Sequence, residues 1–391
     1  MPALLRIGFA LEHSLGHTTH ARNLQAALAR DRFVQPELIE LPYHNTPGAW
    51  AKLPGVRSNW SLRASLGALL GLRGKSFDAL FFHTQVTALL ASGMLKKTPG
   101  LISLDATPLQ YDRLGAHYGH TPGNSRLEVL KARLNQRAFA AARGLLTWSQ
   151  WTKDSLISDY GVPGDKIFVI PPGVDIAAWD SARALRKPRT TDAPLNVLFV
   201  GGDFIRKGGD TLLAAFDLLP EPVRRTAHLH LVTQATELAP AANITVHNGV
   251  TPNSERLRTL FAEADIFVFP TRADCLPQAV LEAMAASLPV ITTAVAAIPE
   301  AVIENETGKL VPVGDEKALA LALENLLTDE TLRLRLGSTA RQEALARYDA
   351  AKNYPQILAR LKGLAPLTPA GRGDKKVFPL IPPAGRGMGG R

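Results

Sequence analysis

Two series of short apolar runs, separated by longer amphipathic stretches, restrict the architectures open to this chain. Examples are FDALFFHT at 77–84 and GLISLDA at 100–106 in the first half, and NVLFVGGD at 196–203 and DIFVFPT at 265–271 in the second. Runs that are apolar at nearly every position are typical of strands buried on both faces, as in parallel sheets. Stretches such as THARNLQAALAR at 19–30 have instead the period of helices. This alternation predicts an α/β fold with helices on both faces of parallel sheets.

The length of 391 residues predicts two domains of this kind, because a single core rarely extends beyond about 250–300 residues. A polar, basic stretch, ALRKPRTTDAPLN at 184–196, separates the two series. We expect two facing, doubly wound Rossmann-like domains at 1–180 and 190–345, with a cleft between the carboxyl ends of their strands. Helical residues 346–365 are expected to cross back to the first domain. Residues 366–391, rich in Gly, Pro and Arg, are expected to be disordered.

Charge is distributed unevenly along the chain. Residues 1–190 contain 23 Lys or Arg and 13 Asp or Glu, whereas residues 191–365 contain 16 and 21. A basic half attracts nucleic acid, anionic lipid or acidic small molecules, so charge alone does not identify the partner. The one cysteine, Cys275, excludes an internal disulfide and is typical of a reducing compartment. We find no secretory signal pattern and no apolar run of about 20 residues, and therefore expect a cytoplasmic protein.

A loop rich in glycine and cations follows one of the buried strands. In VLFVGGDFIRKGGDTLLAAF, residues 197–216, the strand ends in two glycines, the second being Gly202. Adjacent Arg206 and Lys207 follow, and Asp210 is expected to cap the next helix. Glycine lets a backbone approach a ligand closely, and a guanidinium beside an ammonium suits a diphosphate. The stretch alone would also fit an ordinary strand–turn–helix connection with an exposed basic pair.

Two carboxylates with seven residues between them occur in TRADCLPQAVLEAMAASLPVI, residues 271–291. Asp274 is expected on the loop at the end of a buried strand, and Glu282 one to two turns into a helix that runs from Pro277 to Ala286. A carboxylate can accept hydrogen bonds from two adjacent hydroxyls, so it suits the diol of a ribose or hexose. Glu282 could instead be an acid on the helix surface. Its apolar flanks, AVL and AMAA, favour a buried position.

Together, these two motifs resemble those of the retaining group-one (family 4) glycosyltransferases, which have the GT-B fold. The resemblance covers about residues 145–350, including the passage PPGVD at 171–175. It implies transfer of a hexosyl unit from a UDP- or GDP-linked sugar to a hydroxyl acceptor, with no other cofactor. The acceptor would be a glycan, a lipid or a small molecule. We also find no DxD motif that would hold a metal ion.

The resemblance also implies a role for individual residues. Arg206 and Lys207 would bind the donor diphosphate and stabilise the charge that builds on it, and Glu282 would bind the ribose hydroxyls. Asp274 would hold hydroxyls of the transferred sugar. The remaining implied binding residues are Gly16 and Gly202 near the phosphates, Asn248 and Val250 beside the base, and the backbone of Cys275, Leu276 and Gln278 beside the sugar.

The chain departs from the family pattern at two of these places. The family usually has Glu where this chain has Asp274, which keeps the charge on a shorter arm. Many members have His after the fourth strand of the first domain, where LISLDATPLQYD at 101–112 offers Asp105. Either Asp105 or His83 takes over that polar role. His83 follows two Phe on an apolar strand, so it fits a core position equally well.

Two other classes of function are open. A GT-B epimerase or phosphorylase would share the fold, although we find no lysine region typical of pyridoxal binding. A basic nucleic-acid-binding protein would use the first half and the Arg-Gly tail, but aromatic residues make up only 6% of the chain.

The segment RSNWSLRASLGALLGLRGK, residues 57–75, bears on the acceptor. It combines Trp60 and a Leu-rich face with flanking Arg and Lys, which suits a helix at an anionic membrane surface. The alternative, which we favour, is an ordinary domain helix that packs its leucines on the sheet.

Overall fold

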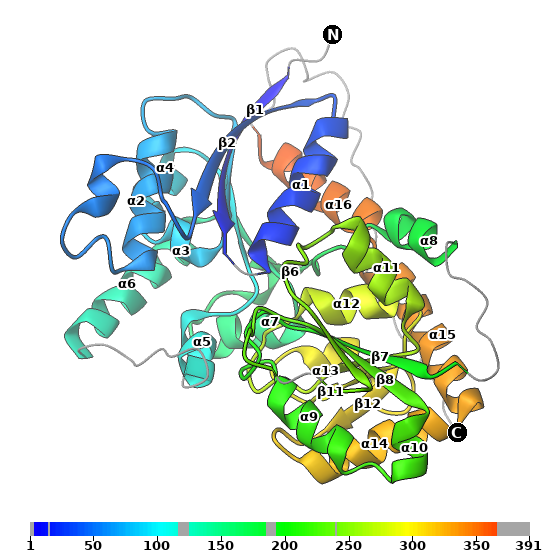
Figure 1. The fold of residues 1–391 in the computed structure, drawn as a ribbon. Coiled ribbons are helices and arrows are strands. Elements are labelled where there is room, and N and C mark those ends of the chain that lie inside the picture. Colours follow the sequence, from blue (N-terminus) through cyan, green and yellow to red (C-terminus); the bar gives the residue numbers. More distant parts are fainter. Residues whose placement is uncertain (1–3, 15, 116–124, 185–192, 239–240, 366–391) are drawn as a thin grey trace, which may run out of the picture.

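The structure is a computed structural model that describes residues 4–14, 16–115, 125–184, 193–238 and 241–365. The tail at 366–391, for which we expect disorder, lies outside these residues. The described chain forms two six-stranded parallel sheets flanked by helices (Figure 1), which confirms the predicted α/β class.

The first sheet has the strand order β2-β1-β3-β4-β5-β6. Its strands are β1 (Leu5–His13), β2 (Val34–Pro42), β3 (Ala79–His83), β4 (Gly100–Leu104), β5 (Gly144–Thr147) and β6 (Ile167–Val169). The chain leaves β1 toward β2 and later returns to the other side of β1 as β3. Ligands of open α/β sheets bind at such a reversal, outside the carboxyl ends of the strands.

Helices cover both faces of this sheet, as the apolar strands require. Along β3, Phe81 faces α1 (His17–Arg30) and α16 (Ala350–Leu364), whereas Phe82 faces the opposite layer. That layer contains α2 (Trp60–Leu72), α3 (Gln85–Ala88), α4 (Ser92–Lys97) and α6 (Ser125–Ala141). Two further helices, α5 (Pro108–Leu114) and α7 (Gln150–Ser158), begin near the carboxyl ends of β4 and β5.

The second sheet has the order β12-β11-β10-β7-β8-β9. Its strands are β7 (Leu195–Val200), β8 (Ala227–Val232), β9 (Ile244–His247), β10 (Ile266–Phe269), β11 (Val290–Thr293) and β12 (Gly308–Val311). The strand order is that of Rossmann dinucleotide-binding folds, with the reversal between β7 and β10. The basic loop, residues 201–208 with Arg206 and Lys207, follows β7, and the acidic loop, residues 270–277 with Asp274, follows β10. The topology therefore brings the two predicted motifs together.

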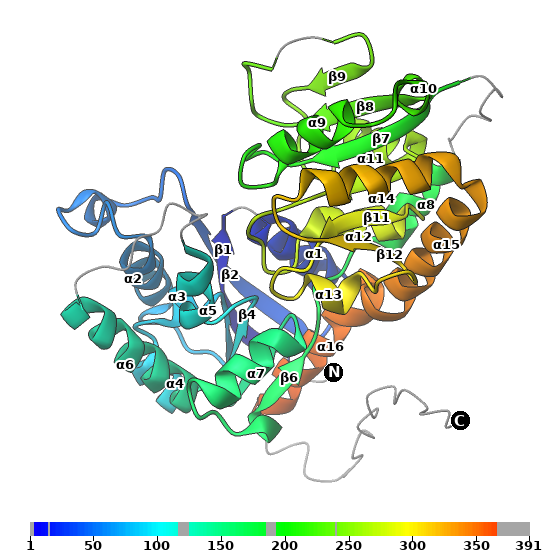
Figure 2. The same cartoon turned by 90° about the horizontal axis from the view of Figure 1, so that it is seen from below.

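Helices also cover both faces of the second sheet. One layer contains α9 (Gly209–Asp217), α10 (Glu221–Arg225) and α14 (Glu316–Thr328). The other contains α8 (Ile176–Ala184), α11 (Glu255–Glu263), α12 (Gln278–Ala285) and α15 (Glu330–Arg347), and a short helix, α13 (Ile298–Ala301), follows β11. Figure 2 shows the two domains side by side.

The chain crosses between the domains twice, near Val174 and near residues 348–350, and the two crossings are hydrogen-bonded to each other. Val174 donates its N–H to the carbonyl of Tyr348 (2.7 Å), and its own carbonyl accepts from Ala350 (2.9 Å). From there α16 returns to the first sheet and lies beside α1 (Figure 1). Its residues Tyr354 and Leu358 are buried there.

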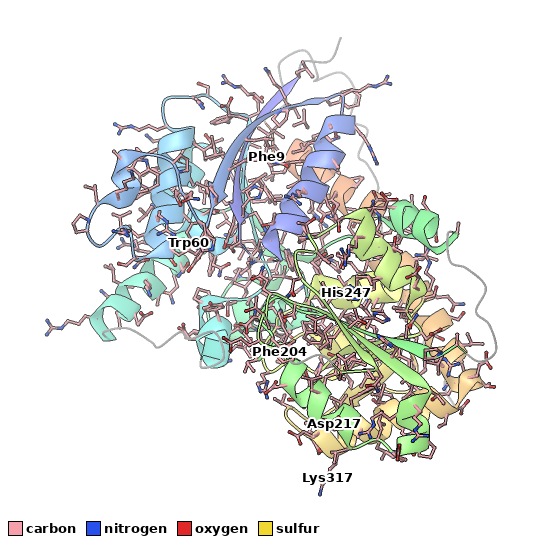
Figure 3. All side chains as sticks on the ribbon, viewed as in Figure 1. Phe9, Trp60, Phe204, Asp217, His247 and Lys317 are labelled. Atoms are coloured by element: carbon pink, nitrogen blue, oxygen red, sulfur yellow. The ribbon has the colours of Figure 1, made fainter. Side chains whose placement is uncertain are left out.

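Helix α2 is an ordinary domain helix. Asn59 caps its start, and Ala64, Ala68 and Leu72 are buried on the first sheet. Trp60, labelled in Figure 3, donates its indole N–H to the Glu12 carboxylate (3.0 Å). Within the described ranges, no helix combines the length and the apolar character that crossing a membrane requires.

Candidate active site

The two loops at the reversal of the second sheet touch through their backbones. Gly208 follows Lys207 with a φ of +79°, a left-handed conformation that favours glycine. A Cβ on Gly208 would lie 2.0 Å from the carbonyl oxygen of Pro270, at the end of β10. The Arg206 carbonyl accepts the N–H of Arg272 (2.9 Å). The glycine therefore allows the basic loop to pack directly on the acidic loop.

Three charged side chains meet where these loops touch. Lys207 donates to the Asp274 carboxylate, and Nη1 of Arg206 lies 3.8 Å from the same oxygen. Arg206 is also held by the Ala273 carbonyl (2.9 Å) and by Asp203 (3.0 Å). Burial lowers the pKa of Lys207, and the charge of Asp274 opposes this effect. The two cations and Asp274 are thus held in one largely buried group, with Asp203 as a second acid beside Arg206.

Asp210 does not cap α9, contrary to our expectation. The residue at the cap position is Gly208, and Asp210 lies in the first turn. Its carboxylate accepts two hydrogen bonds from Arg272 (2.6 and 2.8 Å), and this pair ties α9 to the acidic loop. The left-handed Gly208 starts the helix two residues earlier than the sequence suggested.

Glu282 is buried within α12, so the alternative of a surface acid is wrong. The helix starts at Gln278 with Pro277 as its cap residue, and Glu282 follows one turn later with 5% of its surface exposed. Burial raises the pKa of Glu282 to about 7. A buried carboxylate has to be compensated by hydrogen-bond donors, and the hydroxyls of a ligand would supply them.

The start of α12 faces the first domain. A Cβ on Gly16, at the start of α1, would lie 3.8 Å from the side chain of Gln278. Both polar atoms of the Gln278 amide are buried and make no hydrogen bond within the described part of the chain. Leu276 packs into the core of the second domain. Gly16 and Gln278, both predicted ligand contacts, therefore lie opposite each other at the domain boundary.

Asp105 lies at the same boundary, after β4. Its carboxylate is 3.6 Å from Nε2 of His17, at the start of α1. Burial raises the pKa of Asp105, and the nearby His17 opposes this effect. On the opposite side, burial and the adjacent Asp105 carboxylate raise the pKa of the Cys275 thiol. Asp105 is thus placed against the acidic loop of the second domain.

His83 lies deeper in the first domain than Asp105. Its ring is fully buried, 4.4 Å from the ring of His20 and 5.8 Å from that of Trp148. Neither ring nitrogen makes a hydrogen bond among the residues described, and burial holds the pKa of His83 well below its usual value. His17 lies between His83 and Asp105, with its ring 5.0 Å from that of His83. Of the two candidates, Asp105 is the one beside the acidic loop.

The sequence reasoning missed this group of aromatic and imidazole rings. His17 and His20 are three residues apart, which places them on one face of α1, and this spacing was the available signal. Trp148, directly after β5, and His83, at the end of β3, join them, so only the folded structure reveals the full group. In the described ranges, no three His, Cys, Asp or Glu side chains are grouped to hold a metal ion.

The residues expected beside the base hold local structure. The Asn248 amide donates to the carbonyls of Thr233 (2.9 Å) and Ala235 (3.0 Å), and thereby fixes the loop after β8. Val250 is half-buried against the core. Gly202, which is expected near the phosphates, has room for a Cβ that would lie 3.6 Å from Gln234. Their contact with a ligand stays a prediction.

Known proteins share both halves of this architecture. Residues 15–178 match the family described as Glycosyltransferase Family 4, and residues 194–329 match Glycosyl transferases group 1. A D-inositol 3-phosphate glycosyltransferase of Xylanimonas cellulosilytica is 30% identical over 53% of this chain and 54% of that protein. A GDP-mannose-dependent alpha-(1-6)-phosphatidylinositol monomannoside mannosyltransferase of Mycolicibacterium smegmatis is 29% identical over 63% of this chain and 69% of that protein.

A solved structure extends the likeness over both domains. Anabaena HepE, in complex with UDP and glucose, has a TM-score of 0.65 at 17% identity, covering 92% of this chain and 99% of that one. The chain spans about half the length of the first curated relatives that it matches. From the two family matches and the two facing parallel sheets, we conclude that the chain belongs to the group 1, family 4 glycosyltransferases of the GT-B fold.

Proposed function

We propose that this protein is a retaining glycosyltransferase that moves a hexosyl unit from a nucleotide-diphosphate sugar to a hydroxyl acceptor. One observation carries the proposal: Lys207 and Arg206 meet Asp274 at the strand reversal of the second sheet. This is where α/β folds bind nucleotides, and the group offers cations for phosphate and a carboxylate for hydroxyls.

The basic pair would act on the leaving group. As the bond between the sugar and the diphosphate breaks, negative charge grows on the departing phosphate, and fixed cations stabilise it. In the free protein, Asp274 neutralises Lys207. A donor phosphate would compete for Lys207 and release the Asp274 carboxylate to accept hydrogen bonds from the sugar.

The nucleotide would lie along α12 with its ribose at the buried Glu282. We propose a UDP- or GDP-linked sugar as the donor. The names of the similar proteins support both choices, because the mycobacterial relative is GDP-mannose-dependent and the Anabaena structure contains UDP.

The acceptor would bind on the first domain, opposite the acidic loop, near Asp105 and His17. We propose a hydroxyl of a glycan, a lipid or a small molecule. The names of two relatives include an inositol phosphate and a phosphatidylinositol mannoside, and the basic first half of the chain would favour such anionic acceptors. Contact with an anionic membrane surface in the cytoplasm would fit the same charge.

The test begins with a panel of UDP- and GDP-sugars, assayed for protection of the protein against thermal unfolding. The protective donor is then incubated with candidate acceptors, and the anomeric configuration of the product is determined by NMR. Retained configuration with release of nucleoside diphosphate supports the proposal. Inverted configuration would refute retention, and interconversion of the donor without transfer would indicate the epimerase alternative. Tight, salt-dependent oligonucleotide binding without donor protection would indicate the nucleic-acid alternative.

Lys207→Ala tests the leaving-group role. We expect kcat to fall by more than KM rises, because the phosphate contact strengthens as charge develops. Lys317→Ala is the matched control, because Lys317 is exposed on α14, at the end of the second domain far from the first (Figure 3). An unchanged kcat in Lys207→Ala would contradict the assignment.

A further inference from the structure

The short helix α13 of the second domain makes a polar contact with the first domain. The Glu300 carboxylate accepts the backbone N–H of Gln150 (2.8 Å) and that of Trp151 (2.7 Å). These are the first two N–H groups of α7, which have no partner inside their own helix. A carboxylate at this end of a helix is favoured by the helix dipole and by two charge-assisted hydrogen bonds. Glu300 thus caps a helix of the other domain.

Helix α7 holds the segment that carries Asp105. Thr152, in the first turn of α7, donates its hydroxyl to the carbonyl of Asp105. The Gln110 amide donates to the carbonyl of Trp151 (2.8 Å). The hydroxyls of Thr107 and Ser155 are 2.8 Å apart. A displacement of α7 would therefore displace Asp105.

The other end of the α13 turn holds the acidic loop. Ala297, three residues before Glu300, donates its N–H to the carbonyl of Cys275 (3.1 Å), next to Asp274. The carbonyl of Glu300 itself accepts from Nη1 of Arg347 (2.6 Å) and from the Tyr348 hydroxyl (3.4 Å), close to the second crossing between the domains. The segment 297–300 is thus fixed to the acidic loop and to the crossing.

We infer that Glu300 is a positioning residue that sets the placement of Asp105 relative to the acidic loop at Asp274 and Cys275. The route runs from the acidic loop to Ala297, from Glu300 to α7, and from Thr152 to Asp105. The inference rests on the proposed function, because it assumes that the substrate reacts between Asp105 and Asp274. It adds a residue that touches neither substrate and yet controls the distance between the two sides of the site.

The first experiment compares Glu300→Gln with Glu306→Gln, an exposed acid six residues further along. Glu300→Gln removes the negative charge and one of the two acceptor oxygens. We expect kcat of Glu300→Gln to fall about tenfold to a hundredfold, as for loss of a charged hydrogen bond. Affinity for nucleoside diphosphate should change by less than about twofold, because Glu282 and Lys207 lie within the second domain. Equal losses of kcat and nucleotide affinity would indicate general damage to the second domain and overturn the inference.

The second experiment tests the route itself with Thr152. Thr152→Val removes the hydroxyl at nearly constant shape, and Thr152→Ser keeps it. We expect Thr152→Val to lower kcat and Thr152→Ser to retain most of it. Combined with Glu300→Gln, Thr152→Val should add little further loss, since both changes break one chain of contacts. Fully additive effects would overturn the inference.

Hydrogen exchange provides a readout that does not depend on activity. In Glu300→Gln, the amides of 105–110 and of 273–278 should lose protection together with the start of α7. Loss confined to the start of α7 would refute the positioning role even if transfer activity is never found. Conversely, linked loss of protection in a protein that transfers no sugar would leave the positioning intact and count against the proposed function alone.

Discussion

At the scale of single residues, we predict that the two acids bind different parts of the donor, Asp274 the transferred sugar and Glu282 the ribose. We predict that Asp274→Asn lowers turnover about tenfold to a hundredfold, since one charged hydrogen bond to the sugar is lost. Affinity for free nucleoside diphosphate should stay equal or rise, because Lys207 loses its internal counter-charge. Glu282→Gln should instead weaken the binding of free nucleoside diphosphate. Calorimetry with nucleoside diphosphate checks both variants, and equal weakening would contradict the division.

Glu282 also predicts a pH dependence of stability. Burial raises its pKa from 4.5 to about 7, so between these values the folded state binds more protons than the unfolded state. Glu282 therefore contributes a free energy of unfolding that falls as pH rises through this window, and this slope is opposed by His20 and His83, whose pKa values burial lowers. Glu282→Gln should remove that slope and stabilise the free protein at pH 8 by up to about 3 kcal/mol. Urea denaturation at pH 5 and pH 8 measures this, and a destabilised variant at pH 8 would refute it.

The sequence predicted the placement of site residues that are close along the chain, but it did not reveal contacts between residues that are far apart along it. The seven-residue spacing placed Asp274 on a loop and Glu282 in a helix, and the structure agrees. The contact between Glu300 and Gln150 joins residues 150 positions apart, and that between His17 and Asp105 joins two elements through the sheet. No local pattern encodes such pairs, because they depend on how the strands are ordered.

At the scale of elements, the glycines of the basic loop have different duties. We predict that Gly208→Ala lowers the free energy of unfolding by about 1–3 kcal/mol or more, because its Cβ would collide with the Pro270 backbone at a positive φ. Because the loop is displaced, the variant should also lose most of its transferase activity. Gly202→Ala is the control for folding, since a Cβ there meets only ordinary contacts. Thermal unfolding of the two variants checks this, and equal stability would contradict it.

The sequence predicted which segments form helices and strands, but it did not always predict the residue at which each element starts. Near-continuous apolar runs correctly indicated parallel strands, and the Leu-rich helix packs on the sheet as favoured. Asp210 failed as a cap because the left-handed Gly208 already ends the loop. At this left-handed position the backbone also approaches the carbonyl of Pro270, directly after β10. Local cap preferences were overridden here by a contact between distant segments.

At the scale of the whole molecule, the relation between the domains depends on the paired crossings. The sequence indicated two doubly wound domains, because two series of strands flank a polar boundary. It could not show that Val174 and Asp349 would pair, or that the Asn23 amide would donate to the Gly173 carbonyl (2.9 Å). These contacts tie both crossings to the first domain. At Gly173, in the PPGVD passage, the two crossings are so close that a side chain would collide with Ala350.

Gly173, in the first crossing, packs against the backbone of Ala350 in the second. A Cβ at this position would lie 2.3 Å from Cα of Ala350 and 2.7 Å from its nitrogen, and a change of rotamer cannot move backbone atoms. In Gly173→Ala the two crossings must therefore separate at the start of α16. We expect the free energy of unfolding to fall by about 1–3 kcal/mol and kcat to fall, as the first domain shifts against the second.

Nucleoside diphosphate affinity should persist in Gly173→Ala, because Glu282 and Lys207 both lie within the second domain. Gly164→Ala is the matched control, since its Cβ would have the Ile157 side chain at an ordinary 3.5 Å. Small-angle scattering with and without nucleoside diphosphate would show an altered radius only in Gly173→Ala. If both variants kept the same radius and the same kcat, the paired crossings would not set the arrangement of the domains, and the rigidity would have to come from the Glu300 contact with α7.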